Sequence, residues 1–204
     1  MSDLYGEAPK AKPVIEELVP SAEDKNIYRE IEYALNISDS LIYLTGELED
    51  FASFDFISRC RTILANRDDG DDSPINVIIN SPGGSMYEMF SIIDYMKSLS
   101  VPVNTICRGR AFSAAAMILV CGTGTRFASP NSTIMLHEGS AFNIGKNSDV
   151  QASAKHISQM ELAANTLLDN VSNKDTNWWK DNTRTDMYLT PSEAMELKLI
   201  DKII

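Results

Sequence analysis

Short apolar runs alternate along this chain with longer stretches in which apolar residues recur at helical spacing. The short runs end at glycine, asparagine or a charged residue, as buried strands do. They predict strands over residues 41–45, 75–79, 101–107, 134–137 and 201–204. The most C-terminal of these runs closes the chain.

The longer stretches have start signals typical of helices. They predict helices over residues 21–36, 50–66, 86–99, from about 113, and over 149–172. We expect Ser148 to cap the longest helix, and Thr190 with Glu193 forms a capping box that places Pro191 at the first helical position. Strands that alternate with helices at this spacing indicate βαβ units and an α/β fold with a largely parallel sheet.

The N-terminal end differs from the rest of the chain. Residues 1–20 hold three of the eight prolines and show no sustained apolar period, so we expect a flexible, extended arm. Residues 21–204 contain neither an internal repeat nor a linker between compact parts. They are therefore predicted to form one domain.

The net charge is strongly negative, with 18 Lys and Arg against 29 Asp and Glu, which gives −11. A surface of that sign repels phosphate, so nucleic acid and anionic membrane are not expected as partners. Since no apolar stretch reaches about 20 residues and the first residues lack an apolar signal region, we predict a cytoplasmic protein. The three cysteines, Cys60, Cys107 and Cys121, lie in apolar runs and are interpreted as buried thiols in a reducing compartment.

Two glycine-bearing turns follow predicted strands. Gly83 and Gly84 come after the strand at 75–79, and Gly109 precedes Ser113 by four positions. Glycine lets backbone N–H groups face outward without a Cβ in the way, and a helix N-terminus favours developing negative charge. Either turn alone is ordinary, because a serine at a helix start usually just caps the helix.

The search for an acid–base partner is short because the chain has two histidines. His156 lies mid-helix and is expected to be a surface or packing residue, whereas His137 ends a predicted strand, where its ring can face a cleft. The residues alone thus give a candidate Ser113–His137 pair and a candidate oxyanion hole. They leave the third member open among many carboxylates.

Four motifs occur in order along the chain. They are Asn80-Ser-Pro-Gly-Gly84, Gly109-x-Ala-x-Ser113, Pro130-Asn-Ser-x-Ile-Met-Leu-His137 and Asp186-x-Tyr-Leu-Thr-x-x-Glu-Ala-x-x-x-x-Leu-Ile-Asp201. At these residues, and at Tyr43-Leu-Thr-Gly-Glu-Leu-Glu-Asp50, the sequence resembles the ClpP peptidase family. The resemblance covers roughly residues 41–204.

The resemblance implies a crotonase-like α/β fold, a single domain over 21–204 with a protruding handle helix at about 149–172. It implies a serine endopeptidase that cleaves unfolded polypeptides or peptides inside a ring-shaped oligomer, without a cofactor or a metal ion. Ser113 would be the nucleophile, His137 the general base and Asp186 the orienting carboxylate.

The same resemblance assigns the groups around the reacting carbonyl. The backbone N–H groups of Gly84 and Ala114 would form the oxyanion hole. Substrate contacts would come from Gly83, Ser85 and Met86.

The chain departs from the family where Clp ATPases dock in apolar pockets between subunits. Polar residues occupy four positions that are usually apolar there, namely Asn76, Ser98, Arg108 and Ser129. A fully buried apolar anchor contributes about 1.5–3 kcal/mol. We therefore expect an AAA+ Clp ATPase to dock weakly, or a different partner to be used.

A second departure concerns ring pairing. Thr185 replaces an arginine that helps two rings associate in the family, so a heptamer and a tetradecamer both remain open. Two other functions remain as alternatives. The chain could be a catalytically silent subunit that assembles with an active paralogue, or a crotonase-type acyl-CoA enzyme that uses the oxyanion hole without Ser113.

Overall fold

A computed structural model describes residues 30, 32–140 and 144–204 of the chain. The chain divides into two compact units, residues 1–34 and 35–204. The predicted arm over 1–20 and the start of the predicted helix at 21 lie outside the described residues. The predicted end of that helix at Asn36 is wrong, because Leu35–Asn36 is a strand.

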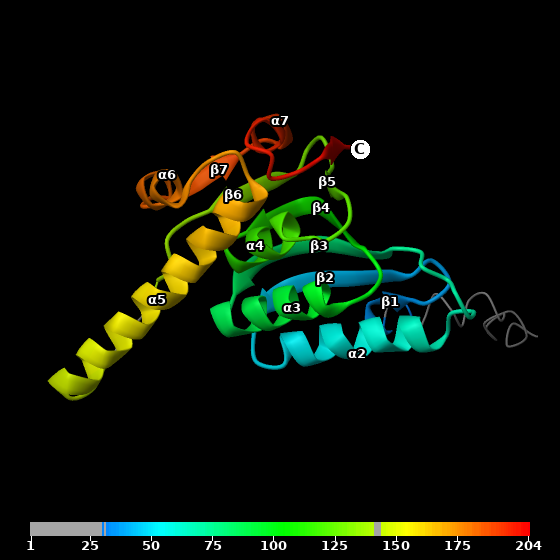
Figure 1. Cartoon of the computed structure of the whole chain (residues 1–204), viewed down its shortest axis with the longest axis horizontal. Coiled ribbons are helices and arrows are strands. Elements are labelled where there is room, and N and C mark those ends of the chain that lie inside the picture. Colours follow the sequence, from blue (N-terminus) through cyan, green and yellow to red (C-terminus); the bar gives the residue numbers. More distant parts are fainter. Residues whose placement is uncertain (1–29, 31, 141–143) are drawn as a thin grey trace, which may run out of the picture. The chain divides into compact units, whose positions relative to one another are not determined.

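Residues 35–204 are built on one eight-stranded sheet in the part of the chain that the structure describes. Its main order is β1-β2-β3-β4-β5-β8, and β6 pairs with β4 and β7 (Figure 1). The strands are β1 (Leu35–Asn36), β2 (Leu41–Leu48), β3 (Ile75–Gly84), β4 (Val103–Phe112), β5 (Arg126–Ala128), β6 (Thr133–Leu136), β7 (Met187–Leu189) and β8 (Lys202–Ile203). Only the β1–β2 and β6–β7 pairs of this sheet are antiparallel, which confirms the prediction of a largely parallel α/β sheet.

Apart from α6, the helices from α2 onward agree with the sequence prediction to within a few residues. They are α2 (Ala52–Ala65), α3 (Met86–Ser98), α4 (Ala114–Val120), α5 (Asn147–Val171), α6 (Thr176–Asn182) and α7 (Pro191–Glu196). The capping box of Thr190 and Glu193 is confirmed, with Pro191 in the first turn of α7. The short elements β5, α6 and β7 were not predicted, since three to seven residues are too few to show a period.

Three strands continue through residues predicted to end them. β2 runs past Gly46, β3 runs through the Ser-Pro-Gly-Gly turn to Gly84, and β4 runs past Gly109 to Phe112. The pairing shifts register between Thr45 and Glu47, and again after Ile79, so bulges absorb the irregular residues. At these residues, where the sequence predicts strand ends, the strands continue with an irregular register.

The long helix α5 is the predicted handle helix. It begins at Asn147 after Lys146, so the prediction that Ser148 caps it is wrong. Leu168 is its one buried residue in the described structure, and the N-terminal half of α5 extends away from the sheet (Figure 1). A helix so exposed gains little stability from packing against its own chain. We therefore expect its apolar positions to pack against a partner surface.

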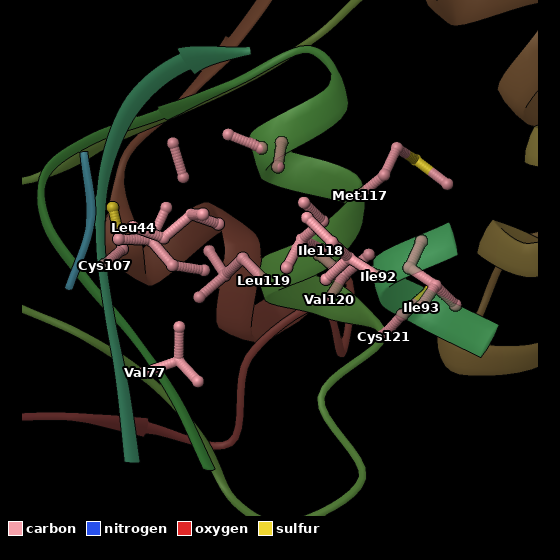
Figure 2. Close-up of a cluster of buried hydrophobic side chains, with 14 of the residues drawn as sticks. Leu44, Val77, Ile92, Ile93, Cys107, Met117, Ile118, Leu119, Val120 and Cys121 are labelled. Atoms are coloured by element: carbon pink, nitrogen blue, oxygen red, sulfur yellow. The ribbon is translucent and has the colours of Figure 1, made fainter. Parts of the chain in front are cut away.

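The core lies between the sheet and helices α2, α3 and α4. Every residue of α4 is buried, and Figure 2 shows its side chains packed among those of Leu44, Val77 and Ile92. Burial raises the pKa of the Cys60 thiol to about 12 and those of Cys107 and Cys121 to about 11. The prediction of buried thiols is confirmed, and at neutral pH they are protonated and unsuited to nucleophilic chemistry.

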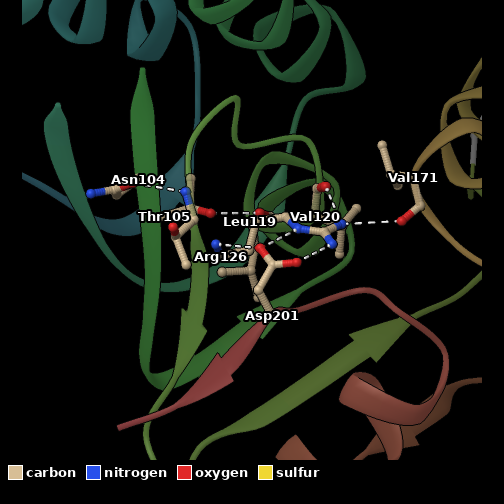
Figure 3. A network of polar contacts seen from close by, with 8 residues as sticks. Asn104, Thr105, Leu119, Val120, Arg126, Val171 and Asp201 are labelled. Atoms are coloured by element: carbon tan, nitrogen blue, oxygen red, sulfur yellow. Dashed lines mark hydrogen bonds and ion pairs between the residues drawn. The ribbon is translucent and has the colours of Figure 1, made fainter. Parts of the chain in front are cut away.

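Arg126 joins four parts of this unit (Figure 3). Its Nε and Nη2 donate to the two carboxylate oxygens of Asp201 at 3.1 and 2.7 Å, and its Nη1 donates to the carbonyls of Val120 and Val171 at 3.2 and 3.1 Å. The Arg126 side chain is 12% exposed. One guanidinium therefore ties the ends of α4 and α5 to the β5–β8 edge of the sheet.

We expect Arg126→Ala to lower the free energy of unfolding by about 2–4 kcal/mol, because it leaves the Val120 and Val171 carbonyls without this donor and removes two hydrogen bonds to Asp201, whose Oδ2 keeps only the backbone N–H of residue 126 from this pair. Arg184→Ala is the matched control, since the Arg184–Asp181 pair is more than 60% exposed on both sides and should contribute less than about 1 kcal/mol. Denaturant unfolding of both variants measures the difference. Equal losses in the two variants would contradict this role of Arg126.

The Arg126 contribution should also depend on pH. Hydrogen bonding from the Arg126 side chain lowers the pKa of Asp201, so the pair stabilises the fold when the carboxylate is ionised. That contribution is present at neutral pH and is lost as the pH falls through the lowered folded-state pKa. The difference in unfolding free energy between wild type and Arg126→Ala should therefore narrow in acid.

Candidate active site

Ser113 lies at the sharp junction between β4 and α4. Its φ of 54° is in the left-handed region, an unusual conformation for a residue with a side chain. Its backbone N–H donates to the Met135 carbonyl at 2.7 Å. The Ser113 side chain makes no capping hydrogen bond to α4, so the ordinary role of a serine at a helix start does not apply here.

His137 follows β6 directly. Because β6 pairs in parallel with β4 and places Met135 beside Phe112, the residues just beyond both strands come together at one edge of the sheet. The Nε2 atom of His137 lies 2.8 Å from the Ser113 Oγ, within hydrogen-bond distance. The pair that the sequence suggested is thus brought into contact.

Asp186 precedes β7. That strand pairs antiparallel with β6, with Met187 opposite Leu136, so Asp186 falls beside His137. An Oδ1 of Asp186 lies 3.5 Å from the His137 Nδ1, and the carboxylate is half exposed. This contact is longer than a strong hydrogen bond. Residue patterns left many carboxylates open, and strand register places Asp186 beside His137.

The two glycines at the end of β3 are in close contact with neighbouring backbone. A Cβ on Gly83 would lie 2.5 Å from the Phe112 carbonyl oxygen, and one on Gly84 would lie 2.4 Å from that of Leu48. Both also have positive φ, 94° and 146°. The two glycine turns seen in the sequence therefore meet: β3 ends against β2 on one side and against Ser113 on the other.

The remaining predicted site residues have ordinary local contacts as well. Ala114 is buried as the first residue of α4. Ser85 caps α3, since its hydroxyl accepts from the Glu88 N–H and its own N–H donates to the Leu48 carbonyl. The Gly83 N–H donates to the Ser81 hydroxyl. Ser85 thus has a structural role in this chain, whatever it contributes to substrate binding.

A cavity of about 380 Å³ opens beside Ser113 and His137. Met86 and Ala114 are the other predicted site residues that line it, whereas Gly83, Gly84, Ser85 and Asp186 do not. Its apolar lining includes Met86, Met89, Met117, Leu136 and Leu168. Helices α5 and α6 close its far side, and sequence patterns gave no signal that these late elements reach the site.

Charged side chains also line this cavity. Glu161 is half-buried there, Glu138 is exposed, and Lys180 is exposed at the α6 wall of the cavity. Gly139 lies between α3 and α5, because a Cβ on it would meet the Met86 sulfur at 3.3 Å and the Glu161 Oε1 at 3.4 Å. The cavity therefore combines an apolar surface with charges on several sides.

His156 is placed away from Ser113, on α5. Its Nε2 is 3.0 Å from the Tyr87 hydroxyl, and the two rings are stacked with centroids 6.2 Å apart. The expectation of a surface or packing residue is met by this contact.

Among the described residues there is no cluster of three metal-ligating side chains, and none of the described helices is long and apolar enough to cross a membrane.

The four polar residues predicted to weaken ATPase docking lie on or near the sheet and at the end of α3. Asn76 accepts a hydrogen bond from Asn104 at 3.0 Å, and the Ser98 hydroxyl donates to the Tyr95 carbonyl at 2.7 Å. Arg108 is exposed on β4, and Ser129 bonds through its backbone to Cys107 and Ser132. The side chains of Asn76 and Ser98 are therefore already hydrogen-bonded within this chain.

Strand pairing in a largely parallel α/β sheet brings Ser113, His137 and Asp186 together, an arrangement of residue types that also occurs in serine hydrolases. A family model described as Clp protease matches residues 24–204, and the chain belongs to that family. The family has the crotonase-like α/β fold, so the predicted fold class is confirmed. The family is one of proteases, which are hydrolases.

Curated relatives agree with this assignment. ATP-dependent Clp protease proteolytic subunit 3 of Frankia casuarinae is 31% identical over 202 residues, covering 98% of this chain and 93% of the relative. The ATP-dependent Clp protease proteolytic subunit of Porphyromonas gingivalis is 34% identical over 167 residues, covering 81% and 74%. Subunit 2 of Frankia casuarinae is 34% identical over 174 residues, covering 84% and 78%.

Proposed function

We propose that this chain is a serine endopeptidase in which Ser113, His137 and Asp186 form a catalytic triad. The observation that carries the proposal is the 2.8 Å contact between the Ser113 Oγ and the His137 Nε2, made by a serine that does not cap its helix. Buried thiols with raised pKa leave the cysteines without a part in the reaction.

The chemistry follows from these positions. His137 accepts the Ser113 proton as the hydroxyl oxygen attacks a peptide carbonyl, and Asp186 stabilises the imidazolium that forms. The backbone N–H groups of Gly84 and Ala114 hold the oxyanion of the tetrahedral intermediate. His137 then returns its proton to the leaving amine, the peptide bond breaks, and water hydrolyses the acyl-enzyme by the same route.

The cavity beside Ser113 supports a polypeptide substrate. Its apolar lining fits a side chain of the peptide, next to the bond that Ser113 attacks. Gly83, Ser85 and Met86 are proposed to contact the peptide near this point, and Met86 lines the cavity itself. An extended chain can bring its carbonyl to Ser113 while one of its side chains enters the cavity, so unfolded polypeptides and peptides are the expected substrates.

Self-association into a heptamer or a tetradecamer is part of the proposal. The exposed apolar side chains of the described residues include Phe51, Phe54, Ile144 and Leu162, at 74%, 65%, 84% and 59%. Exposed apolar groups of this size favour an interface between subunits. We place the assembly in the cytoplasm, in keeping with three free, buried cysteines.

Docking of a Clp ATPase is proposed to be weak. The relatives carry names that include ATP dependence, whereas Asn76, Ser98, Arg108 and Ser129 put polar groups in this chain where the pocket would need apolar ones. A submicromolar complex with a standard Clp ATPase would contradict this part of the proposal.

A fluorophosphonate probe tests the nucleophile directly. Wild type should be labelled covalently and hydrolyse fluorogenic peptides, Ser113→Ala should lose the label, and Ser148→Ala on exposed α5 should keep it. Light scattering on the same preparation gives the assembly size. A wild-type oligomer that is assembled but neither labels nor hydrolyses peptide would favour the catalytically silent subunit instead.

A further inference from the structure

Tyr188 lies on β7, two residues after Asp186. Its hydroxyl donates to the Asp186 Oδ2 at 3.2 Å, while the Asp186 Oδ1 faces the His137 Nδ1 at 3.5 Å. The two oxygens of one carboxylate are thus divided between a phenol and an imidazole. The proposed triad of Ser113, His137 and Asp186 gives Tyr188 no part in the reaction.

Asp186 needs such a second contact. Its side chain is 51% exposed and lies in the short segment before β7, where water competes for both oxygens. A carboxylate held only through one long contact can turn about its χ angles, and each rotamer that leaves His137 is unproductive. A hydrogen bond to the outer oxygen restricts that rotation.

The Tyr188 ring is itself held in place near Ser113. It packs edge-to-face on Phe112, with ring centroids 5.7 Å apart and planes at 85°, and the Arg110 guanidinium lies 5.8 Å from the centre of the Phe112 ring. Strand pairing places Tyr188 opposite Met135. Since Phe112 directly precedes Ser113, one side chain contacts both the strand that delivers the serine and the carboxylate that faces the histidine.

We propose that Tyr188 is a positioning residue for the hydrolytic reaction, and that it acts by holding Asp186 toward His137. The inference rests on the proposed function above and adds a fourth residue to it. The phenol remains a donor at neutral pH: the hydrogen bond to Asp186, and after it the negative charge of that carboxylate, raise the pKa of Tyr188.

Tyr188→Phe is the decisive variant. It keeps the ring on Phe112 and removes one hydroxyl from a residue that is 57% exposed, so folding and assembly should be unaffected. We expect kcat for a fluorogenic peptide to fall about threefold to tenfold, the usual effect of one hydrogen bond, with KM changed less than about twofold. Tyr95→Phe, which alters a half-buried tyrosine on α3 outside the cavity lining, is the matched control and should behave as wild type.

A double-mutant cycle with Asp186→Asn tests whether Tyr188 acts through that carboxylate. The rate of fluorophosphonate labelling serves as the readout, because it remains measurable in slow variants. Introduced into the wild-type protein, Tyr188→Phe should slow the labelling reaction. Introduced into the Asp186→Asn variant, it should change the labelling rate by less than about twofold.

The outcomes separate this inference from the proposed function. If wild type is active and Tyr188→Phe matches it, or if the loss is equally large in Asp186→Asn, the positioning role is overturned and the triad stands. If wild type neither labels nor hydrolyses, the triad and the role of Tyr188 are overturned together.

Discussion

Replacing Ser113 by alanine is expected to lower kcat for peptide hydrolysis by about 10⁴- to 10⁶-fold. The substitution removes the oxygen that is proposed to attack the carbonyl, the Ser113 Oγ that lies 2.8 Å from the His137 Nε2. What activity remains would come from binding and from the oxyanion hole acting on water. Hydrolysis of a fluorogenic peptide, followed over short times for wild type and over long incubations for the variant, covers this range of rates.

The same experiment tests whether Ser113 and His137 act as a unit. His137→Ala alone should cost nearly as much as Ser113→Ala, and the double variant should be little worse than either, because each loss disables the same step. Since the Ser113 hydroxyl does not cap α4, the free energy of unfolding of Ser113→Ala should stay within about 1 kcal/mol of wild type. More than about one per cent of wild-type activity in folded Ser113→Ala would rule out this nucleophile.

The Ser113–His137 pair was accessible from sequence because both residues follow apolar runs. The carboxyl ends of parallel strands meet at one edge of a sheet, so residues that follow those strands are candidates for a shared site. Asp186 was predicted only through the family resemblance, because residue patterns left the carboxylate open. Its position depends on β7, a strand of three residues paired antiparallel with β6, and such a strand leaves no period in the sequence.

The glycine turns show where pattern reasoning fails on the fold itself. Glycine and proline after an apolar run predict a strand end, yet β3 continues through Ser81 and Pro82 to Gly84. Pairing with β2 on one side and β4 on the other, with shifted register, satisfies the backbone there. Tertiary contacts of this kind are set by distant residues, so a local pattern does not contain them.

The cavity walls were the least predictable part of the site. Met89 and Met117 look like core positions of two helices, and the structure places them beside Ser113 as well. Glu161 and Lys180 look like solvated positions of two surface helices, yet they line the same cavity. Which face of a helix meets a site depends on how α5 packs against α4 and α6, and helix periodicity does not determine that packing.

Gly84→Ala should lower peptide hydrolysis per folded molecule by about 10²- to 10³-fold, the usual loss for one oxyanion donor. Its Cβ would lie 2.4 Å from the Leu48 carbonyl oxygen, a backbone atom that cannot turn aside as a side chain can. The end of β3 must then shift away from β2, where Gly84 pairs with Leu48, and the Gly84 N–H moves with it. A loss of unfolding free energy should accompany the loss of rate.

Gly70→Ala provides the matched control for this substitution. Gly70 also has a positive φ, 84°, but a Cβ added there would have no neighbouring atom within 4 Å, so the variant shares the backbone strain without the collision. It should lose about 1–2 kcal/mol of stability and keep wild-type hydrolysis. Unfolding curves give the folded fraction of each variant, and hydrolysis is compared per folded molecule. Wild-type rates in folded Gly84→Ala would show that the N–H at this position does not hold the oxyanion.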